Sequence, residues 1–254
     1  MRLSNYLAQK YNLSRRFVKI LIKEGRVAHK GQPLTRDKEI SAPEADLGFE
    51  LDISPISLTF SPDDYLIKEE GGVVFFYKPS GMHTERLNPL DPLCLDDVVK
   101  KCYPHHKLLS RLDYPVDGVV AAFPTGSKPV RIRKEYLAWV EGNFPLTLTG
   151  KWNVDAAKRR RVEAFSSDDG IFMEFTRLAL NNERSLVQIA LEKAHRHQVR
   201  AVLALLGYPI IGDRLYREGY SGLIERILLH AARVEIDGVS CESHYIKDFM
   251  SIWA

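Results

Sequence analysis

The sequence has few cysteines, no long apolar run and none of the common nucleotide or metal motifs. No apolar run approaches the ~18 residues that a membrane helix needs, and residues 1–6 lack the apolar stretch of a secretory signal. The three cysteines are odd in number and are not spaced for zinc, which favours a reduced, cytoplasmic location. A phosphate-cradling glycine loop, an HExxH zinc pair and a nucleophile elbow are all missing. These absences predict a protein without a membrane span, a nucleotide cofactor or a bound metal.

The composition is that of an ordinary globular protein. The chain has 254 residues, of which 45% are hydrophobic and 27% charged, and this excludes disorder, collagen and coiled coil. The length suits one large domain, or a small domain joined to a medium one, with a sizeable core.

The charge is unevenly distributed, although the net charge is only +3. Residues 1–40 hold ten Lys and Arg against three acidic residues, whereas residues 41–72 hold one Lys against eight acidic residues. A basic head followed by an acidic stretch predicts a nucleic-acid-binding module and a connector. The alternative is two solvated faces of opposite sign.

The basic head has the pattern of a miniature domain. Leu3, Tyr6 and Leu7 are spaced for a first helix, and Ser14 as N-cap and Gly25 as the stop delimit a second. Residues 26–33 read as a short strand and a tight turn, and residues 47–51 as a strand that closes the domain. We therefore predict an α/β-hairpin domain with its acidic connector over residues 1–60. Its second helix carries the basic side chains Arg15, Arg16, Lys19 and Lys23.

Strand patterns dominate the rest of the chain. Helical stretches are fewer, chiefly residues 95–102 and 198–206, the latter stopped by Gly207. Strands in series without regular helical crossovers predict an α+β domain on a largely antiparallel sheet over residues 61–254. The expected strands are residues 73–77, 118–123, 135–140, 172–180, 186–191 and 228–236.

Three segments carry candidate chemistry. Residues 109–120 place Asp113 on a turn before an apolar strand, residues 134–142 place Tyr136 on one face of a strand, and Arg200 lies at the start of a helix. Taken singly, each is weak, because a surface salt bridge or an ordinary strand aromatic explains it equally well. A run at residues 158–161 is either a second phosphate contact or a solvated loop.

Taken together and in order, these segments resemble the RluA-type pseudouridine synthases, which isomerise uridine in structured RNA. The resemblance rests on six motifs between residues 77 and 231: Tyr77–Met82, Ser110–Asp113 with Gly118, Lys134–Tyr136, Ala194–Arg200, Gly207–Asp213 and Leu228–Ala231. The head resembles the small αL RNA-binding module of a ribosomal small-subunit protein.

The resemblance implies a role for each matched residue and no cofactor. Asp113 would be the nucleophile and Arg200 its charge partner, while Tyr136 would stack on uracil with its hydroxyl near the proton that the ring loses. Arg111 would fill the space left by the flipped base, and Leu229 would form part of the apolar pocket floor. The implied protein is a monomer that binds structured RNA, with ribosomal RNA favoured and transfer RNA possible.

The chain departs from the family pattern at Ser110, at Val116-Asp117 and at Ala194-His195. These departures leave an alternative open, in which a catalytically weakened RNA-binding protein or assembly factor uses the same fold. A small-molecule hydrolase built on Asp113 and His197 is a third hypothesis, but no nucleophile, base and orienting group are visible together.

Overall fold

The computed structural model describes the chain except for residues 12, 14, 24, 42–47, 53–60, 88–92, 156–160, 218–223, 225 and 254, and describes only the backbone of residues 16 and 62. The described residues form two compact units: residues 1–52 together with Leu87, and the remaining residues from 61 onward. The expected N-cap Ser14 and most of the basic run at 158–161 lie outside the described residues. No described helix has the length and apolar character needed to cross a bilayer.

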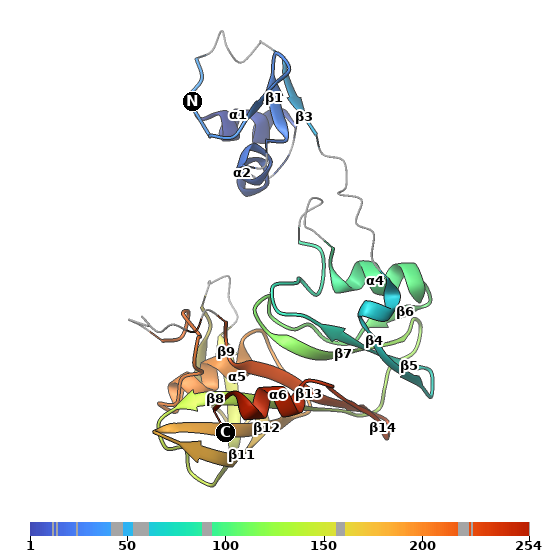
Figure 1. Ribbon diagram of the computed structural model, residues 1–254, viewed down its shortest axis with the longest axis vertical. Helices are drawn as coiled ribbons and strands as arrows, with labels where there is room; N and C mark the ends of the chain where they lie inside the picture. Colours follow the sequence, from blue (N-terminus) through green and yellow to red (C-terminus); the bar gives the residue numbers. More distant parts are fainter. Residues whose placement is uncertain are drawn as a thin grey trace. The chain divides into compact units, whose positions relative to one another are not determined.

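The small unit contains two helices and a three-stranded antiparallel sheet, ordered β2-β1-β3 (Figure 1). Gly25 ends the second helix with a φ of +69°, which suits glycine because it has no Cβ. Lys30 and Gly31, both at positive φ, turn the chain between β1 and β2. The elements are α1 (Leu3–Lys10), α2 (Arg15–Lys23), β1 (Val27–His29), β2 (Gln32–Leu34) and β3 (Phe49–Leu51).

One apolar core holds the small unit together. Leu3 and Leu7 from α1 meet side chains spaced by three and four residues on α2, and Val27 and Phe49 join them from the sheet. This spacing places the apolar side chains of α2 on one face and leaves the basic ones on the other. The α2 members of the core are Phe17, Val18, Leu21 and Ile22.

The large unit is built on one long sheet, ordered β10-β9-β11-β12-β8-β13-β7-β5-β4, with β14 on β13 and β6 on β7 (Figure 1). All its described pairings are antiparallel except that of β13 with β7. The strands are β4 (Leu66–Glu70), β5 (Val73–Lys78), β6 (His106–Leu108), β7 (Asp117–Pro124), β8 (Ile132–Glu141), β9 (Thr147–Asp155), β10 (Glu163–Ser166), β11 (Ile171–Asn181), β12 (Arg184–Leu191), β13 (Leu229–Ile236) and β14 (Val239–Glu242). The α+β class with a largely antiparallel sheet is thereby confirmed.

Helices cover both faces of this sheet. The buried side chains of α4 (Leu95–Cys102) and α5 (Gln198–Leu205) share a core with Val74, Tyr136 and Leu229. Phe249 from α6 (Ile246–Met250) packs with Trp139 and other side chains of the opposite face. Short 3-10 turns lie at Pro62–Asp64 and Ser251–Trp253.

The sheet narrows to a short contact at its centre. The parallel pairing of β13 with β7 joins only His230 to Asp117 and Ala231 to Gly118. A Cβ on Gly118 would lie 2.2 Å from the carbonyl oxygen of Ala231, and its φ of +127° is open mainly to glycine. Glycine therefore permits the two halves of the sheet to meet next to the Asp113 turn.

The sequence analysis missed one strand in the acidic stretch of residues 41–72. Residues 66–70, at the end of this stretch, were not among the expected strands, but they form β4, an edge strand of the large sheet paired with β5. Its charged residues, Lys68, Glu69 and Glu70, are exposed, and charge at a sheet edge discourages pairing with other chains.

Candidate active site

Asp113 lies in the turn that leads from β6 into β7. The backbone N–H of Val116 donates to the Asp113 carbonyl at 3.0 Å and closes this turn. The buried hydroxyl of Thr84 donates to the Leu112 carbonyl at 2.8 Å and accepts the Leu112 N–H at 3.1 Å. The backbone is therefore fixed on both sides of the Asp113 side chain.

A buried lysine reaches the same turn, where the Lys78 ammonium lies 3.5 Å from the Tyr114 carbonyl oxygen. The Lys78 ammonium, at the end of β5, donates to the carbonyls of Pro79 and Met82 at 2.9 Å each. Burial lowers the pKa of Lys78 to about 8, against the opposing charges of Asp117 and Asp113. Sequence reasoning assigned no role to this residue, although it falls within the Tyr77–Met82 motif.

Arg200 joins Asp113 to a second carboxylate. From the first turn of α5, its Nη1 donates to Asp113 Oδ2 at 2.8 Å, while Nε and Nη2 donate to the two oxygens of Asp213 at 2.8 Å each. Burial opposes the charge on Arg200, but the hydrogen bonds and charges of Asp213 and Asp113 outweigh it and raise the pKa of the guanidinium. Arg200 is therefore a permanent positive charge beside Asp113. Sequence reasoning missed Asp213, which ends the Gly207–Asp213 motif.

Tyr136 and Leu229 lie on the face of the sheet that packs against α4 and α5. Both are buried members of one core, and Tyr136 stands opposite Ala231 where β8 pairs with β13. Burial raises the pKa of the Tyr136 hydroxyl, and the charge of Asp113 adds to this effect. Tyr136 is therefore a neutral phenol within the electrostatic reach of the carboxylate.

His197 and Tyr216 complete the cluster. His197 Nε2 lies 3.7 Å from Asp113 Oδ2, and His197 Nδ1 lies 3.1 Å from the Tyr216 hydroxyl. Sequence reasoning considered His197 only for a hydrolase, and it did not single out Tyr216. Within the described residues, no group of three or more His, Cys, Asp or Glu side chains is arranged to hold a metal ion.

The Arg111 side chain forms an ion pair outside the Asp113–Arg200 cluster. Its side chain is 64% exposed, and its guanidinium pairs with Glu85 at 3.1 Å. Exposed ion pairs of this kind contribute about 0–1 kcal/mol, so the side chain is free to change partners.

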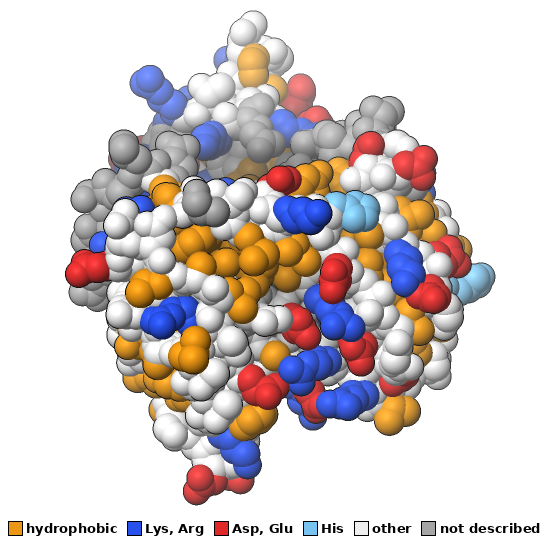
Figure 2. All heavy atoms as spheres, turned by 60° about the horizontal axis from the view of Figure 1, so that its bottom comes forward, with side chains coloured by type: hydrophobic (Ala, Val, Ile, Leu, Met, Phe, Trp, Pro, Cys, Tyr) orange, Lys and Arg blue, Asp and Glu red, His pale blue; other side chains and the backbone are white. Residues whose placement is uncertain are grey.

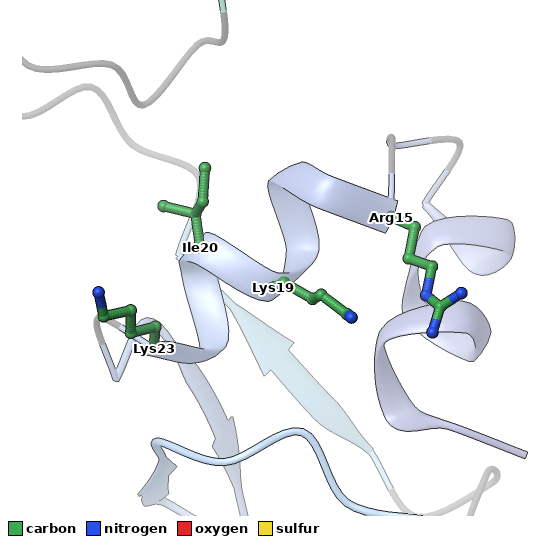
Figure 3. A pocket seen from close by; sticks show the side chains of 4 residues that line it. All are labelled: Arg15, Lys19, Ile20 and Lys23. Atoms are coloured by element: carbon green, nitrogen blue, oxygen red, sulfur yellow. The ribbon is translucent and has the colours of Figure 1, made fainter. Parts of the chain in front are cut away.

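The small unit carries basic side chains along α2. Arg15, Lys19 and Lys23 follow one another at intervals of four residues and, with Ile20, line a hollow in the surface (Figure 3). Intervals of four residues place side chains on the same side of a helix. The fourth expected residue, Arg16, lies on the same helix, but its side chain is outside the description.

Figure 2 shows a face on which basic and acidic side chains are interspersed, beside a patch of hydrophobic ones. Ion pairs of the large sheet have this mixed character, for example Arg133 with Glu174 at 3.0 Å and Arg233 with Glu235 at 3.0 Å. Mixed charge creates no extended positive field, so this face is less suited to a phosphate backbone than the basic side of α2.

No family model matches the chain. An RNA pseudouridine synthase of Helicobacter pylori, named as uncharacterized, is 30% identical over 156 residues, which cover 56% of this chain and 63% of that protein. A Mycoplasma pneumoniae protein with the same type of name is 26% identical over 251 residues and covers 85% of this chain and 77% of its own length. The ribosomal large subunit pseudouridine synthase D of Borreliella burgdorferi is 30% identical over 158 residues, 56% of this chain and 48% of that protein.

The solved structures agree on the fold. Human RNA Pseudouridylate Synthase Domain Containing 1 superposes with a TM-score of 0.58 at 17% identity and covers 76% of this chain and 89% of that one. The chain spans just under two thirds of the length of the first Helicobacter pylori relatives. Relatives and fold point the same way: the chain is similar in sequence to RNA pseudouridine synthases, and it has the fold of a pseudouridylate synthase.

Proposed function

We propose that the protein is an isomerase that converts uridine to pseudouridine in structured RNA, with Asp113 as the nucleophile. The observation that carries this proposal is the 2.8 Å ion pair between Asp113 and the buried Arg200, next to the buried phenol of Tyr136. Permanent charge beside a carboxylate favours its ionised form, which is the form that attacks carbon.

The reaction is an internal rearrangement. The bond from C1′ of the ribose to N1 of uracil breaks, the base turns, and C5 of uracil bonds to C1′; N1 gains a proton and C5 loses one. The difficult step creates an electron-poor sugar carbon, and an ionised carboxylate placed beside that carbon stabilises it or bonds to it. Asp113 supplies this carboxylate.

The uridine has to leave its base stack to reach Asp113, at a cost of a few kcal/mol. Tyr136 and Leu229, both buried on the same face of the sheet, supply an aromatic ring and an apolar wall for the extruded base. Arg111 is suited to fill the vacated space because its present partner Glu85 holds it only by an exposed ion pair.

The RNA backbone is bound by the small unit in this proposal. Arg15, Lys19 and Lys23 present three positive charges along one side of α2 (Figure 3), which matches the repeated negative charge of a phosphate chain. Ribosomal RNA is the favoured substrate, since relatives are named as ribosomal large subunit enzymes; transfer RNA is the second candidate. We expect the protein to act as a cytoplasmic monomer.

The test is to count pseudouridine in RNA treated with the wild type and with Asp113→Asn. We expect the wild type to form pseudouridine in ribosomal or transfer RNA transcripts and Asp113→Asn to form none, because an amide oxygen is a poor nucleophile. Asp168→Asn is the matched control: it makes the same change of charge on an exposed turn of the large unit, and it should keep full activity.

Equal, near-zero product with the wild type and with Asp113→Asn on every RNA would refute the enzyme proposal. Retained RNA binding in that case would favour the alternative, an RNA-binding assembly factor on the same fold.

A further inference from the structure

The two oxygens of the Asp113 carboxylate are in different surroundings. Oδ2 accepts the Arg200 Nη1–H at 2.8 Å and lies 3.7 Å from His197 Nε2. Across the described part of the chain, no group donates a hydrogen bond to Oδ1. One oxygen is therefore anchored and the other is free to react.

The His197 ring is held in place from its other nitrogen. His197 precedes the first turn of α5 at φ 58° and ψ 14°, a left-handed conformation that a side chain disfavours and that persists only when its surroundings maintain it. The hydroxyl of Tyr216 lies 3.1 Å from Nδ1, and the Tyr216 ring stands edge-on to the imidazole. The ring orientation is thus set by Tyr216.

A backbone contact favours one direction for the proton between His197 and Tyr216. The N–H of Val162, whose side chain and backbone are buried, donates to the Tyr216 oxygen at 3.0 Å. That oxygen already serves as an acceptor, so its own proton is available to Nδ1. A neutral imidazole that accepts at Nδ1 carries its proton on Nε2, the nitrogen that faces Asp113. The opposite tautomer would direct a lone pair at the carboxylate.

We propose that His197 is a positioning residue for Asp113: its Nε2–H and Arg200 together hold Oδ2, and Oδ1 is the oxygen that reacts. This inference rests on the proposed isomerase function. Oδ1 bonds to C1′ as the C1′–N1 bond breaks, and the bonding pair leaves with uracil. When C5 later bonds to C1′, the C1′–Oδ1 bond breaks and returns its pair to the carboxylate. The 3.7 Å separation is longer than a hydrogen bond, and such contacts commonly tighten when substrate binds.

The arrangement makes the reaction sensitive to acid. The charged and titratable groups around His197 come from four segments. They are Asp113 in the turn before β7, Arg200 in α5, Arg196 just before α5, and Asp213 and Tyr216 in the segment after α5. Burial lowers the pKa of His197, the two arginines lower it further, and the two carboxylates oppose them. A neutral imidazole is therefore expected near neutral pH. Below that range, a second proton would add positive charge beside Oδ2 and weaken the nucleophile.

The first experiment needs no activity. Nitrogen NMR of the histidine rings in the free, full-length protein distinguishes the two tautomers, and the His197 signal is assigned by its loss in His197→Asn. We expect the Nε2–H form in the wild type and a shift away from it in Tyr216→Phe. An Nδ1–H ring in the wild type would overturn the inference.

The second experiment measures single-turnover rates against pH at saturating enzyme. Asparagine tolerates the left-handed conformation, so His197→Asn keeps the start of α5. We expect its rate to fall about tenfold, the effect of losing one hydrogen bond to a charged group, and its acid limb to disappear while RNA binding is unchanged. His195→Asn, an exposed histidine two residues earlier, is the control and should behave as the wild type.

The outcomes separate the two proposals. An active wild type with a normal rate and pH profile in His197→Asn would overturn the positioning role and leave the isomerase intact. A tenfold loss with an unchanged pH profile would assign His197 a structural role only, which also overturns the inference. If the wild type and Asp113→Asn are equally inactive, the proposed isomerase function is refuted. The NMR result then decides by itself whether the His197 ring carries its proton on Nε2, facing Asp113.

Discussion

Arg200 neutralises the Asp213 carboxylate, and its removal should strongly destabilise the large unit. The Asp213 side chain is only 1% exposed and accepts two hydrogen bonds from Arg200 at 2.8 Å. Arg200→Met leaves this carboxylate buried without its cation. Breaking one partner of a buried ion pair costs about 3–5 kcal/mol, a large share of the roughly 5–15 kcal/mol that stabilises a typical domain.

The double variant Arg200→Met/Asp213→Leu provides the matched comparison. It removes both charges, so it should recover most of the stability that Arg200→Met loses.

The assay is urea unfolding followed by tryptophan fluorescence. All three tryptophans, Trp139, Trp152 and Trp253, lie in the large unit, so the signal reports this unit alone. A change of less than about 1 kcal/mol in Arg200→Met, or a double variant as unstable as the single one, would show that Arg200 does not compensate the buried charge of Asp213.

Three further predictions concern other parts of the molecule. Burial lowers the pKa of Lys134 to about 8, so between pH 8 and the ordinary pKa of lysine the unfolded chain holds a proton that the folded chain has lost. The free energy of unfolding of the wild type should therefore rise by up to about 3 kcal/mol relative to Lys134→Met as the pH increases through this range. Parallel urea titrations of the two proteins that show no such divergence would contradict this. Gly118→Ala should lower the urea midpoint strongly, because its Cβ would meet the Ala231 carbonyl at 2.2 Å; an unchanged midpoint would refute the close approach. Deletion of residues 1–60 should weaken RNA binding and flatten its dependence on salt while the tryptophan unfolding transition remains, and loss of that transition would contradict two independently folded domains.

Much of the fold followed from local pattern. The helix at residues 95–102 and the stop at Gly207 were predicted within a residue, because apolar periodicity and a glycine at positive φ are properties of a short stretch of chain. Strands β5, β7, β8, β11, β12 and β13 were also expected near their observed positions.

The elements that local pattern missed are polar or short. Most residues of β9 and β10 are exposed or half-buried, and β9 includes Gly150 and Lys151, so their apolar signal is weak. The α6 helix spans only Ile246–Met250 and is held by Phe249 against the far face of the sheet. Such elements depend on what they pack against.

The sequence alone determined the class of fold, the order of its motifs and the candidates Asp113, Tyr136 and Arg200. Tertiary structure decided which of these groups meet. The partners of Arg200 lie 13 and 87 residues away in the chain, and periodicity carries no information on contacts between distant segments. The turn before β7, the start of α5 and the segment after it converge only when the sheet and helices pack, and that packing alone leaves one oxygen of Asp113 anchored and the other free.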